Sequence, residues 1–181
     1  MEVLKKFGLF TVATVVVVIA IIWCLDAFGF RSPVFAFLLN WLGMSWAAIG
    51  GQVIQVALPP RYYDIKDFER SGQVYERLGI RLFKRLVRRG PLTFLSPTLR
   101  FPKDRSISAL QQLDSEMRRA ETGHVIIFAV IVLFMCYALL RGWFVAAGWI
   151  LLFNVIINGY PIMLQRYNRI LLQELIQRLS A

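Results

Sequence analysis

The chain alternates between long uncharged stretches and segments rich in charge. Four stretches contain no Asp, Glu, Lys or Arg, and they are Phe7–Leu25, Ser32–Pro60, Thr122–Leu140 and Gly142–Gln165. Each is long enough to cross the hydrocarbon core of a bilayer, which takes about 20 mainly apolar residues in a helix. The pattern therefore predicts an all-α protein with four transmembrane helices, over residues 7–25, 33–58, 124–140 and 143–164.

A charged segment separates the second and third predicted spans. It divides the chain into a first transmembrane hairpin (1–60), a partly amphipathic helical segment (61–121), and a second hairpin that continues into a C-terminal helix (122–181). From Val74 to Arg89, apolar residues recur at intervals of three and four, with cations on the other faces. The apolar positions are Tyr75, Leu78, Leu82, Phe83 and Leu86. A basic amphipathic helix beside membrane spans is expected to lie in the lipid headgroup layer.

The helical pattern is interrupted after this amphipathic helix. Gly90 and Pro91 are expected to end it, and the passage 91–102 is expected to be irregular. Helical spacing resumes over 106–121, and this helix is expected to run into the third span.

The basic charge of the chain follows the predicted topology. The net charge is +10 at pH 7, and 19 of the 21 Lys and Arg residues lie before the first span, between the second and third, or after the fourth. By the positive-inside rule, both termini and residues 61–121 are expected on the cytoplasmic side of a multi-pass membrane protein. Because this orientation accounts for the basic charge, nucleic-acid binding is not expected.

Metal and disulfide chemistry are not expected either. The chain has two cysteines and one histidine, too few for a disulfide framework or for a zinc site with Cys and His ligands. Glu121 and His124 have the spacing of a di-iron ligand motif, but such sites need two of these motifs and two further glutamates. No metal and no cofactor is predicted.

A polar cluster is predicted where the third and fourth spans approach the charged segments. His124 lies 17 residues before the turn Arg141–Gly142 and Asn158 lies 16 residues after it, so an antiparallel hairpin brings them to similar depth. Glu121 is three residues from His124, which puts both on one helical face. Pro161 removes a backbone hydrogen bond and is expected to loosen the fourth span beside Asn158. Ionisable residues in a membrane segment are candidates for function.

These residue types suit acyl transfer to an alcohol. A histidine oriented by a carboxylate is a general base for a hydroxyl, so His124 and Glu121 are the candidate catalytic pair. Amide and guanidinium groups stabilise an oxyanion or hold a substrate. The candidates for that role are Asn158, Gln165, Arg166, Asn168 and Arg169. Each also has a structural interpretation, as a hydrogen bond between helices or as a marker of the inner membrane edge.

The basic amphipathic helix is a candidate site for an acyl donor. Lys84, Arg85 and Arg88 are candidates to hold the phosphates of coenzyme A or of a similar donor, which is a substrate rather than a cofactor. The alternative is that these cations anchor the helix to anionic membrane lipids. The sequence pattern leaves both interpretations open.

Several of these positions recur in a known pattern. They are Phe68-Glu69, Gly72, Tyr75, Ile80-Arg81, Lys84 ahead of Gly90, Glu121, His124, Asn158, Pro161 and the block Gln165-Arg166-Tyr167-Asn168-Arg169. From about Tyr62 to the C-terminus, the chain resembles the glycosyl-4,4'-diaponeurosporenoate acyltransferase family of bacterial carotenoid synthesis. The C-terminal block is the more specific part of the resemblance.

The resemblance implies a reaction and a location. In this family, a fatty acyl chain is attached to a sugar hydroxyl of a glycosylated carotenoid at the bacterial cytoplasmic (inner) membrane. For this chain, the expected acceptor is such a carotenoid or a similar lipid-linked sugar. Ser71 and Phe83 depart from the pattern, since members often have a histidine and a tryptophan at these positions. If that histidine is catalytic, this chain lacks it.

A hypothesis of a different class competes with the enzyme. A small membrane protein with 14 Phe, 5 Trp and one helix-borne histidine also fits a non-catalytic transmembrane subunit of a larger complex, such as a photosynthetic pigment–protein assembly. In that case His124 would ligate a pigment metal and have apolar neighbours. A catalytic base would instead face Glu121 and the amides of the fourth span.

Overall fold

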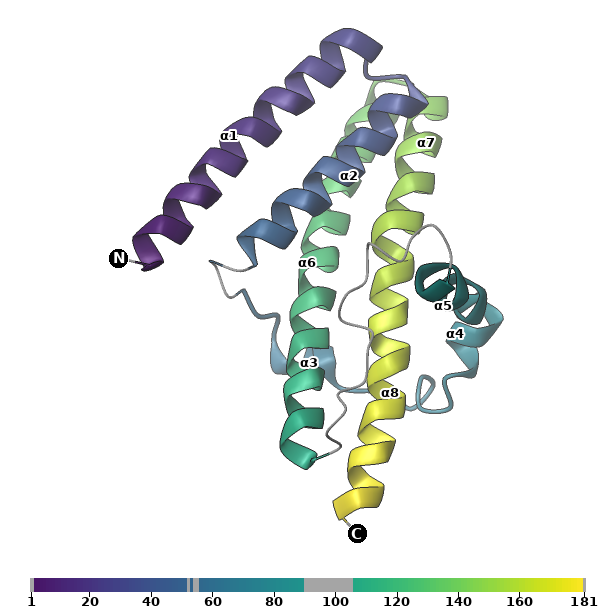
Figure 1. Cartoon of the computed structure of the whole chain (residues 1–181). Coiled ribbons are helices and arrows are strands. Elements are labelled where there is room, and N and C mark those ends of the chain that lie inside the picture. The colour runs from purple at the N-terminus through teal and green to yellow at the C-terminus, as the bar shows by residue number, and fades with distance from the viewer. Residues whose placement is uncertain (1, 52, 54–55, 90–105, 181) are drawn as a thin grey trace. The chain divides into compact units, whose positions relative to one another are not determined.

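The computed structural model describes residues 2–51, 53, 56–89 and 106–180 (Figure 1). Its longer helices are α1 (Glu2–Phe28), α2 (Pro33–Gly50), α6 (Ile107–Leu140), α7 (Phe144–Asn154) and α8 (Tyr160–Ser180). The short helices are α3 (Pro60–Tyr63), α4 (Gln73–Arg77) and α5 (Ile80–Arg89), and a π-helix, η3 (Val155–Gly159), joins α7 to α8. Every regular element among the described residues is helical, which confirms the predicted all-α class.

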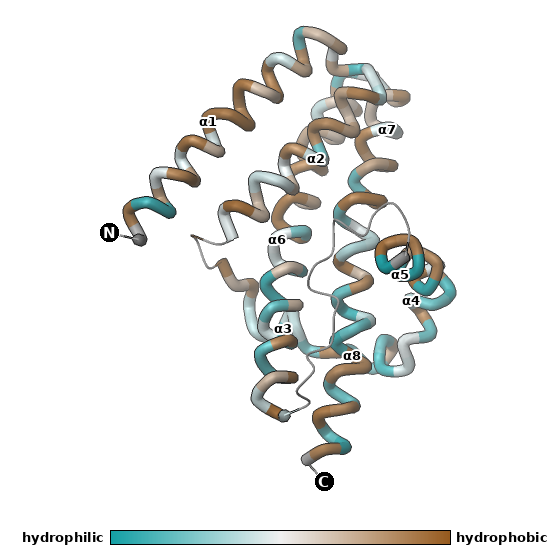
Figure 2. Tube along the Cα trace, viewed as in Figure 1, coloured by the Kyte–Doolittle hydropathy of each residue, from teal (hydrophilic) through white to brown (hydrophobic). Residues whose placement is uncertain are grey.

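Four segments are long and apolar enough to cross a membrane, as the hydrophobic pattern predicted. They are Leu4–Phe28, Pro33–Gly50, Ile107–Leu140 and Phe144–Leu179. The second segment ends at Gly50 rather than near residue 58. Two consecutive glycines begin at residue 50 and weaken the helix there. Figure 2 shows α1 hydrophobic along most of its length, with a hydrophilic patch near its N-terminal end. These lengths and compositions indicate a membrane protein.

The chain folds into two compact units. One, the apolar unit, consists of Met1–Val56 and Thr122–Pro161, and the other, the charged unit, consists of Ala57–Glu121 and Ile162–Ala181. Residues 162–181 thus belong to the same unit as the central segment, and the charged side chains of α8 pair with carboxylates of that segment.

Helices α2, α6 and α7 share the core of the apolar unit. The largest apolar side chains in this core are Phe35 and Leu39 from α2, Ile127 and Ile131 from α6, and Ile150 from α7, and all are buried. Alanines from the same three helices complete it, and such small residues let membrane helices approach closely. Helix α1 packs on α2, where Trp46 Nε1 donates a hydrogen bond of 2.9 Å to Thr14 Oγ1.

Left-handed glycines form the turn of each hairpin. Gly29 follows α1 with φ 73° and Gly142 follows α6 with φ 69°, a conformation that glycine adopts without steric cost. The two turn arginines, Arg31 and Arg141, both stack on the Trp143 ring, at 4.7 and 5.1 Å from its centroid. The two turns therefore lie at the same end of the apolar unit.

The helix after α7 widens immediately before Pro161. The N–H of Tyr160 bonds to the carbonyl of Val155, five residues earlier, which is the π-helical spacing. Pro161 has no N–H with which to continue the ordinary four-residue ladder. The prediction that Pro161 loosens this turn agrees with the structure, and Asn158 lies within the widened turn.

The charged unit contains the region that the sequence predicted as a single amphipathic helix. The structure divides it into α4 and α5 at Gly79, which has φ 80°. Gly72, at the start of α4, has φ 67°, and a Cβ there would lie 3.0 Å from the ring of Tyr167. Both glycines are therefore required by backbone conformation, and Gly72 also by space. The predicted helix end at Gly90 and the irregular passage 91–102 lie outside the described residues.

Helix α5 has apolar residues on two sides. Ile80 and Val87 are buried, whereas the predicted apolar positions Leu82 and Leu86 are exposed, as is Leu78 just before the helix. Lys84 lies between Ile80 and Val87 on the inward side and is half-buried. The periodicity predicted that Lys84 lies on a polar face of the helix. In the structure, the helix buries the side that carries Ile80 and Val87, and Lys84 lies on that side.

Candidate functional site

The single histidine forms part of a polar network in the apolar unit. His124 Nδ1 lies 3.3 Å from Asn158 Oδ1. Similar distances along the chain from the Arg141–Gly142 turn had predicted a common depth for these two residues, and the structure brings their side chains into hydrogen-bond contact. In the part of the chain that the structure describes, no protein group bonds to His124 Nε2.

Three asparagines continue this network, and none has more than 1% of its surface exposed. Asn158 Nδ2 donates to Asn154 Oδ1 at 2.9 Å and to Asn40 Oδ1 at 3.1 Å. Asn154 Nδ2 in turn donates to the Phe128 carbonyl at 3.1 Å, and Asn40 Nδ2 donates to the Ala36 carbonyl at 2.9 Å. Every Asn side-chain nitrogen in the network therefore has an acceptor.

The local fold explains why this polar group exists inside an apolar unit. An unpaired amide in a membrane interior is costly, so the asparagines of α2, α7 and η3 bond to one another. Asn158 belongs to the π-helical turn, and such turns are frequent at functional sites. The sequence did not predict Asn40, because its partners lie far along the chain. The only signal was an Asn within an uncharged span.

A second network, of charged residues, occupies the charged unit. Arg166 Nε and Nη2 donate to the Glu69 carboxylate at 3.1 and 2.8 Å, and its Nη1 donates to Glu121 Oε1 at 3.0 Å. Its Nη1 and Nη2 also donate to the backbone carbonyls of Tyr62 and Asp64. Each guanidinium nitrogen of Arg166 is therefore bonded to a protein acceptor.

Each guanidinium nitrogen of Arg169 is also bonded to a protein acceptor. Its Nε donates to Asp114 Oδ1 at 3.1 Å, its Nη1 to Glu121 Oε2 at 3.1 Å, and its Nη2 to the Tyr63 carbonyl at 2.9 Å. Arg169 and Glu121 are both fully buried. Asp114 also pairs with Arg118 at 2.6 Å, so three arginines and three carboxylates, including Glu69, balance their charges.

The two networks divide the residues that the sequence had grouped into one site. Glu121 uses its two carboxylate oxygens for Arg166 and Arg169, and His124 bonds to the amide of Asn158. The sequence did not predict a role for Asp114. It lies seven residues before Glu121 on the same helix. This spacing puts both carboxylates on one face, and it can be read directly from the sequence.

Burial and hydrogen bonding shift the pKa values of groups around Arg166. Burial acts to raise the pKa of the Glu69 carboxyl, but hydrogen bonds from Arg166 and Tyr75 outweigh it and lower that pKa below 4.5. Burial, and then the negative charge of Glu121, raise the pKa of Tyr62 to about 12. Glu69 is therefore ionised, and Tyr62 neutral, at physiological pH.

Lys84 and Asn168 form a third polar contact, also in the charged unit. Lys84 Nζ donates to Asn168 Oδ1 at 2.6 Å and lies 5.4 Å from the centroid of the Tyr167 ring. Burial, and then the nearby charge of Arg88, lower the pKa of Lys84 from 10.5. Within the described ranges, no carboxylate lies within ion-pair distance of Lys84. Arg85 and Arg88 are exposed.

Two buried amide atoms of α8 have no hydrogen-bond partner among the described residues. They are Asn168 Nδ2 and Gln165 Oε1. A buried polar atom without a partner costs about 1–3 kcal/mol. The Asn168 amide has one orientation, since its oxygen must face the Lys84 ammonium, which can only donate. An unpaired N–H donor therefore lies next to a cation that lacks a carboxylate.

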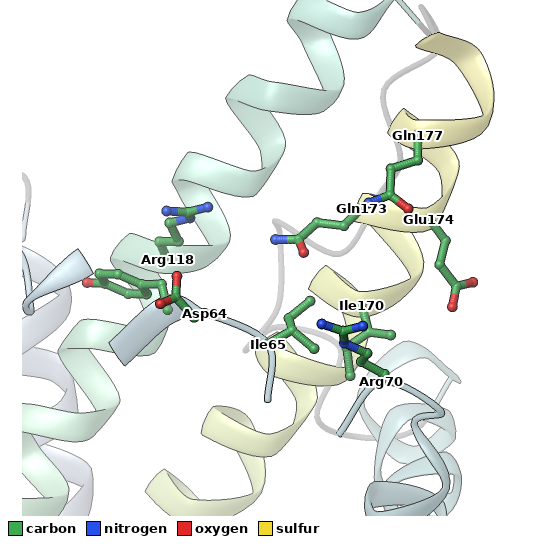
Figure 3. A pocket seen from close by; sticks show the side chains of 9 residues that line it. Asp64, Ile65, Arg70, Arg118, Ile170, Gln173, Glu174 and Gln177 are labelled. Atoms are coloured by element: carbon green, nitrogen blue, oxygen red, sulfur yellow. The ribbon is translucent and has the colours of Figure 1, made fainter. Parts of the chain in front are cut away.

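A pocket of about 440 Å³ opens on the charged unit (Figure 3). Its polar lining includes Asp64 and Arg118, together with Gln173, Glu174 and Gln177 from α8. Figure 3 shows these side chains around the same space. None of the predicted site residues lines this pocket. Among the described residues, no group of three or more His, Cys, Asp or Glu side chains is arranged to hold a metal ion.

Comparison with known families identifies the chain. The model of the glycosyl-4,4'-diaponeurosporenoate acyltransferase family matches residues 59–178. The chain belongs to this family. The match confirms the predicted resemblance and covers all the predicted site residues of this acyltransferase family member. No curated protein and no solved structure matches the chain.

Proposed function

We propose that this acyltransferase family member is an enzyme that transfers a fatty acyl chain to a hydroxyl of a glycosylated carotenoid or of a similar lipid-linked sugar. The family match and the four membrane-span helices support a membrane acyltransferase. The observation that carries the mechanism is the contact of His124 Nδ1 with Asn158 Oδ1 at 3.3 Å, since it leaves Nε2 without a protein partner among the described residues.

The chemical step uses His124 as general base. Nε2 takes the proton of the acceptor hydroxyl as the hydroxyl oxygen attacks the carbonyl carbon of an acyl thioester. The ester C–O bond forms, the thioester C–S bond breaks, and the imidazolium returns its proton to the thiolate that leaves. No serine or cysteine nucleophile is required, because the acceptor oxygen attacks directly.

Asn158 orients the imidazole of His124, a role that the sequence analysis had given to Glu121. An amide holds the ring without placing a charge in the apolar unit, where a charge is costly. Glu121 instead acts on Arg166 and Arg169, whose guanidinium groups hold the charged unit together. Their donors are already bonded to the protein, so their contribution to substrate binding is to position neighbouring residues of α8.

The acyl donor is proposed to bind at Lys84 and Asn168. An anionic oxygen of the donor, such as a phosphate oxygen of coenzyme A, would accept from the unpaired Asn168 Nδ2 and from the Lys84 ammonium. Gln165 supplies an unpaired acceptor beside them. The exposed Arg85 and Arg88 on α5 add positive charge that attracts the donor or anionic membrane lipid.

The location proposed for the enzyme is the bacterial cytoplasmic membrane, with both termini and the charged unit on the cytoplasmic side. The distribution of 19 of 21 basic residues supports this orientation. The exposed leucines Leu78, Leu82 and Leu86, next to arginines, support contact between α5 and the membrane surface.

The proposal is tested by acyl transfer in membranes that contain wild type, His124→Ala or a control variant. The donor is an acyl-coenzyme A and the acceptor is a glycosylated carotenoid. General-base assistance contributes about 10² to 10⁴-fold, so His124→Ala is expected to lose that much activity. Cys136→Ala, an exposed change on the same helix, is expected to retain it.

Transfer by His124→Ala at the wild-type rate would exclude His124 as the base. Absence of any transfer by wild type, with a bound pigment and other polypeptides copurified in stoichiometric amount, would instead support the non-catalytic subunit.

A further inference from the structure

The asparagine network of the apolar unit has a fixed hydrogen-bond direction. Its two outer members are anchored to backbone carbonyls, which only accept hydrogen bonds. Asn40 Nδ2 donates to the Ala36 carbonyl and Asn154 Nδ2 donates to the Phe128 carbonyl. The side-chain oxygens of Asn40 and Asn154 must therefore face Asn158, and both act as acceptors there.

These two oxygens determine the orientation of the third amide. Asn158 Nδ2 donates to both, at 3.1 and 2.9 Å. Rotating the Asn158 amide by half a turn would place its oxygen against two other oxygens, at the loss of two buried hydrogen bonds. A buried polar group left without its partner costs about 1–3 kcal/mol. Asn158 Oδ1 is therefore held toward His124.

An amide oxygen can only accept, so its partner on the imidazole must carry a hydrogen. We propose that Asn40, Asn154 and Asn158 are positioning residues that fix neutral His124 as the tautomer protonated at Nδ1, with the lone pair on Nε2. The catalytic meaning of this tautomer rests on the proposed function, because Nε2 is the atom that takes the acceptor's proton. The tautomer itself follows from the geometry alone.

The network achieves this without a buried charge. In a catalytic triad the carboxylate both selects the histidine tautomer and stabilises the imidazolium. Three neutral amides select the tautomer only, and they add no ion to the membrane-spanning part of the chain, where ions are costly. Asn40 thus acts on the candidate base through Asn158, from a helix that the sequence did not connect with the site.

The tautomer is measurable because the chain has one histidine. Incorporating ¹⁵N-labelled histidine into the full-length protein in lipid gives NMR signals from His124 alone, and the ¹⁵N shift separates protonated from unprotonated ring nitrogens. At neutral or higher pH we expect Nδ1 to be protonated and Nε2 to be unprotonated. A wild-type spectrum with the proton mainly on Nε2 would overturn the proposal, whatever the activity.

A double variant tests whether the asparagines cause this preference. Asn40→Leu with Asn154→Leu removes both acceptors and frees the Asn158 amide to rotate. The His124 spectrum is then expected to show both tautomers, and kcat is expected to fall by part of the about 10² to 10⁴-fold that a general base contributes. Ser45→Ala, which removes a side-chain hydrogen bond elsewhere on α2, is expected to leave both measurements unchanged.

The outcomes separate this inference from the proposed function. A double variant that is folded and still protonated only at Nδ1 would exclude the asparagines as the cause. Wild type with the expected tautomer but with full activity in His124→Ala would overturn the general base while leaving the tautomer assignment intact. Should the double variant not fold, the wild-type spectrum alone still decides the tautomer.

Discussion

Glu121 and Arg169 form an ion pair of 3.1 Å in which neither side chain has more than 1% of its surface exposed. Arg166 adds a second pair to the other oxygen of Glu121, at 3.0 Å. Burying charges requires that every one of them be paired. The two cations on α8 share the Glu121 carboxylate and pair further with Glu69 and Asp114, so the stability of the charged unit depends on all five side chains.

Removing the charge of Glu121 is expected to destabilise the protein strongly. Breaking a buried ion pair by changing one partner typically costs about 3–5 kcal/mol, because the other charge stays buried without compensation. Glu121→Gln should therefore lower the thermal unfolding midpoint in detergent by many degrees. Arg70→Gln is the matched control, since the Arg70–Asp67 pair is largely exposed and such pairs contribute little. Equal midpoints for the two variants would contradict the structural role of Glu121.

Acid is expected to weaken the charged unit through Glu69. Its folded-state pKa lies below its ordinary value of 4.5, so its ionised form stabilises the fold at pH values above 4.5. This contribution is lost as pH falls from 4.5 through the lowered folded-state pKa. Unfolding midpoints of wild type and Glu69→Gln should differ at neutral pH and converge in that acidic range. A difference that stays constant throughout the acid titration would exclude this linkage.

Lys84 is expected to contribute to donor binding rather than to the chemical step. Lys84→Met should raise the KM for acyl-coenzyme A more than it lowers kcat, as expected for an interaction equally strong in ground and transition states. Because the pKa of Lys84 is lowered, its positive charge is lost as the pH rises through a value below 10.5. The wild-type KM for the donor should therefore rise as the pH is raised through that range. In Lys84→Arg the guanidinium stays charged, and this rise should disappear.

Three further cations of the basic segment provide a comparison for Lys84. Replacing Arg85, Arg88 and Arg89 together by Gln is expected to raise the donor KM if they attract the donor phosphate. An unchanged KM, with weaker binding of the protein's surface to anionic lipid, would assign them to membrane anchoring alone.

The orientation of the chain is tested by reporter fusions. Fusions at Ser71 and after Ala181 are both expected to report a cytoplasmic location, because most basic residues lie in the segments that contain these positions. A fusion at Arg141, in an outer turn, should report the opposite side. A periplasmic signal from Ser71 or from Ala181 would overturn the orientation.

The membrane architecture could be predicted from the sequence because it depends on local properties. Charge-free stretches of sufficient length specify the spans, and Gly142 followed by a new apolar stretch specifies the second hairpin turn. Counting residues from that turn predicted that His124 and Asn158 lie at similar depth, since the rise of a helix is nearly constant. Recognition of the family depended on the identities of residues in the C-terminal block.

The pairing of side chains could not be predicted in the same way. Three-residue spacing made Glu121 a natural partner for His124, but spacing gives proximity on a helix and not the lowest-energy partner. A fully buried carboxylate needs positive charge more than it needs a neutral ring, and Arg166 and Arg169 supply it. His124 is left to the amide of Asn158.

By itself, the sequence determined the helical class, the four apolar spans and the family, because each is encoded in composition, periodicity or residue identity along the chain. Only the tertiary structure decided that Asn40 joins the His124 network, that Lys84 faces inward, and that Asp114 completes the ion pairs of Arg169. These contacts link residues distant in sequence, and they are selected by the need to pair every buried charge and amide. That need is satisfied only when the helices have packed.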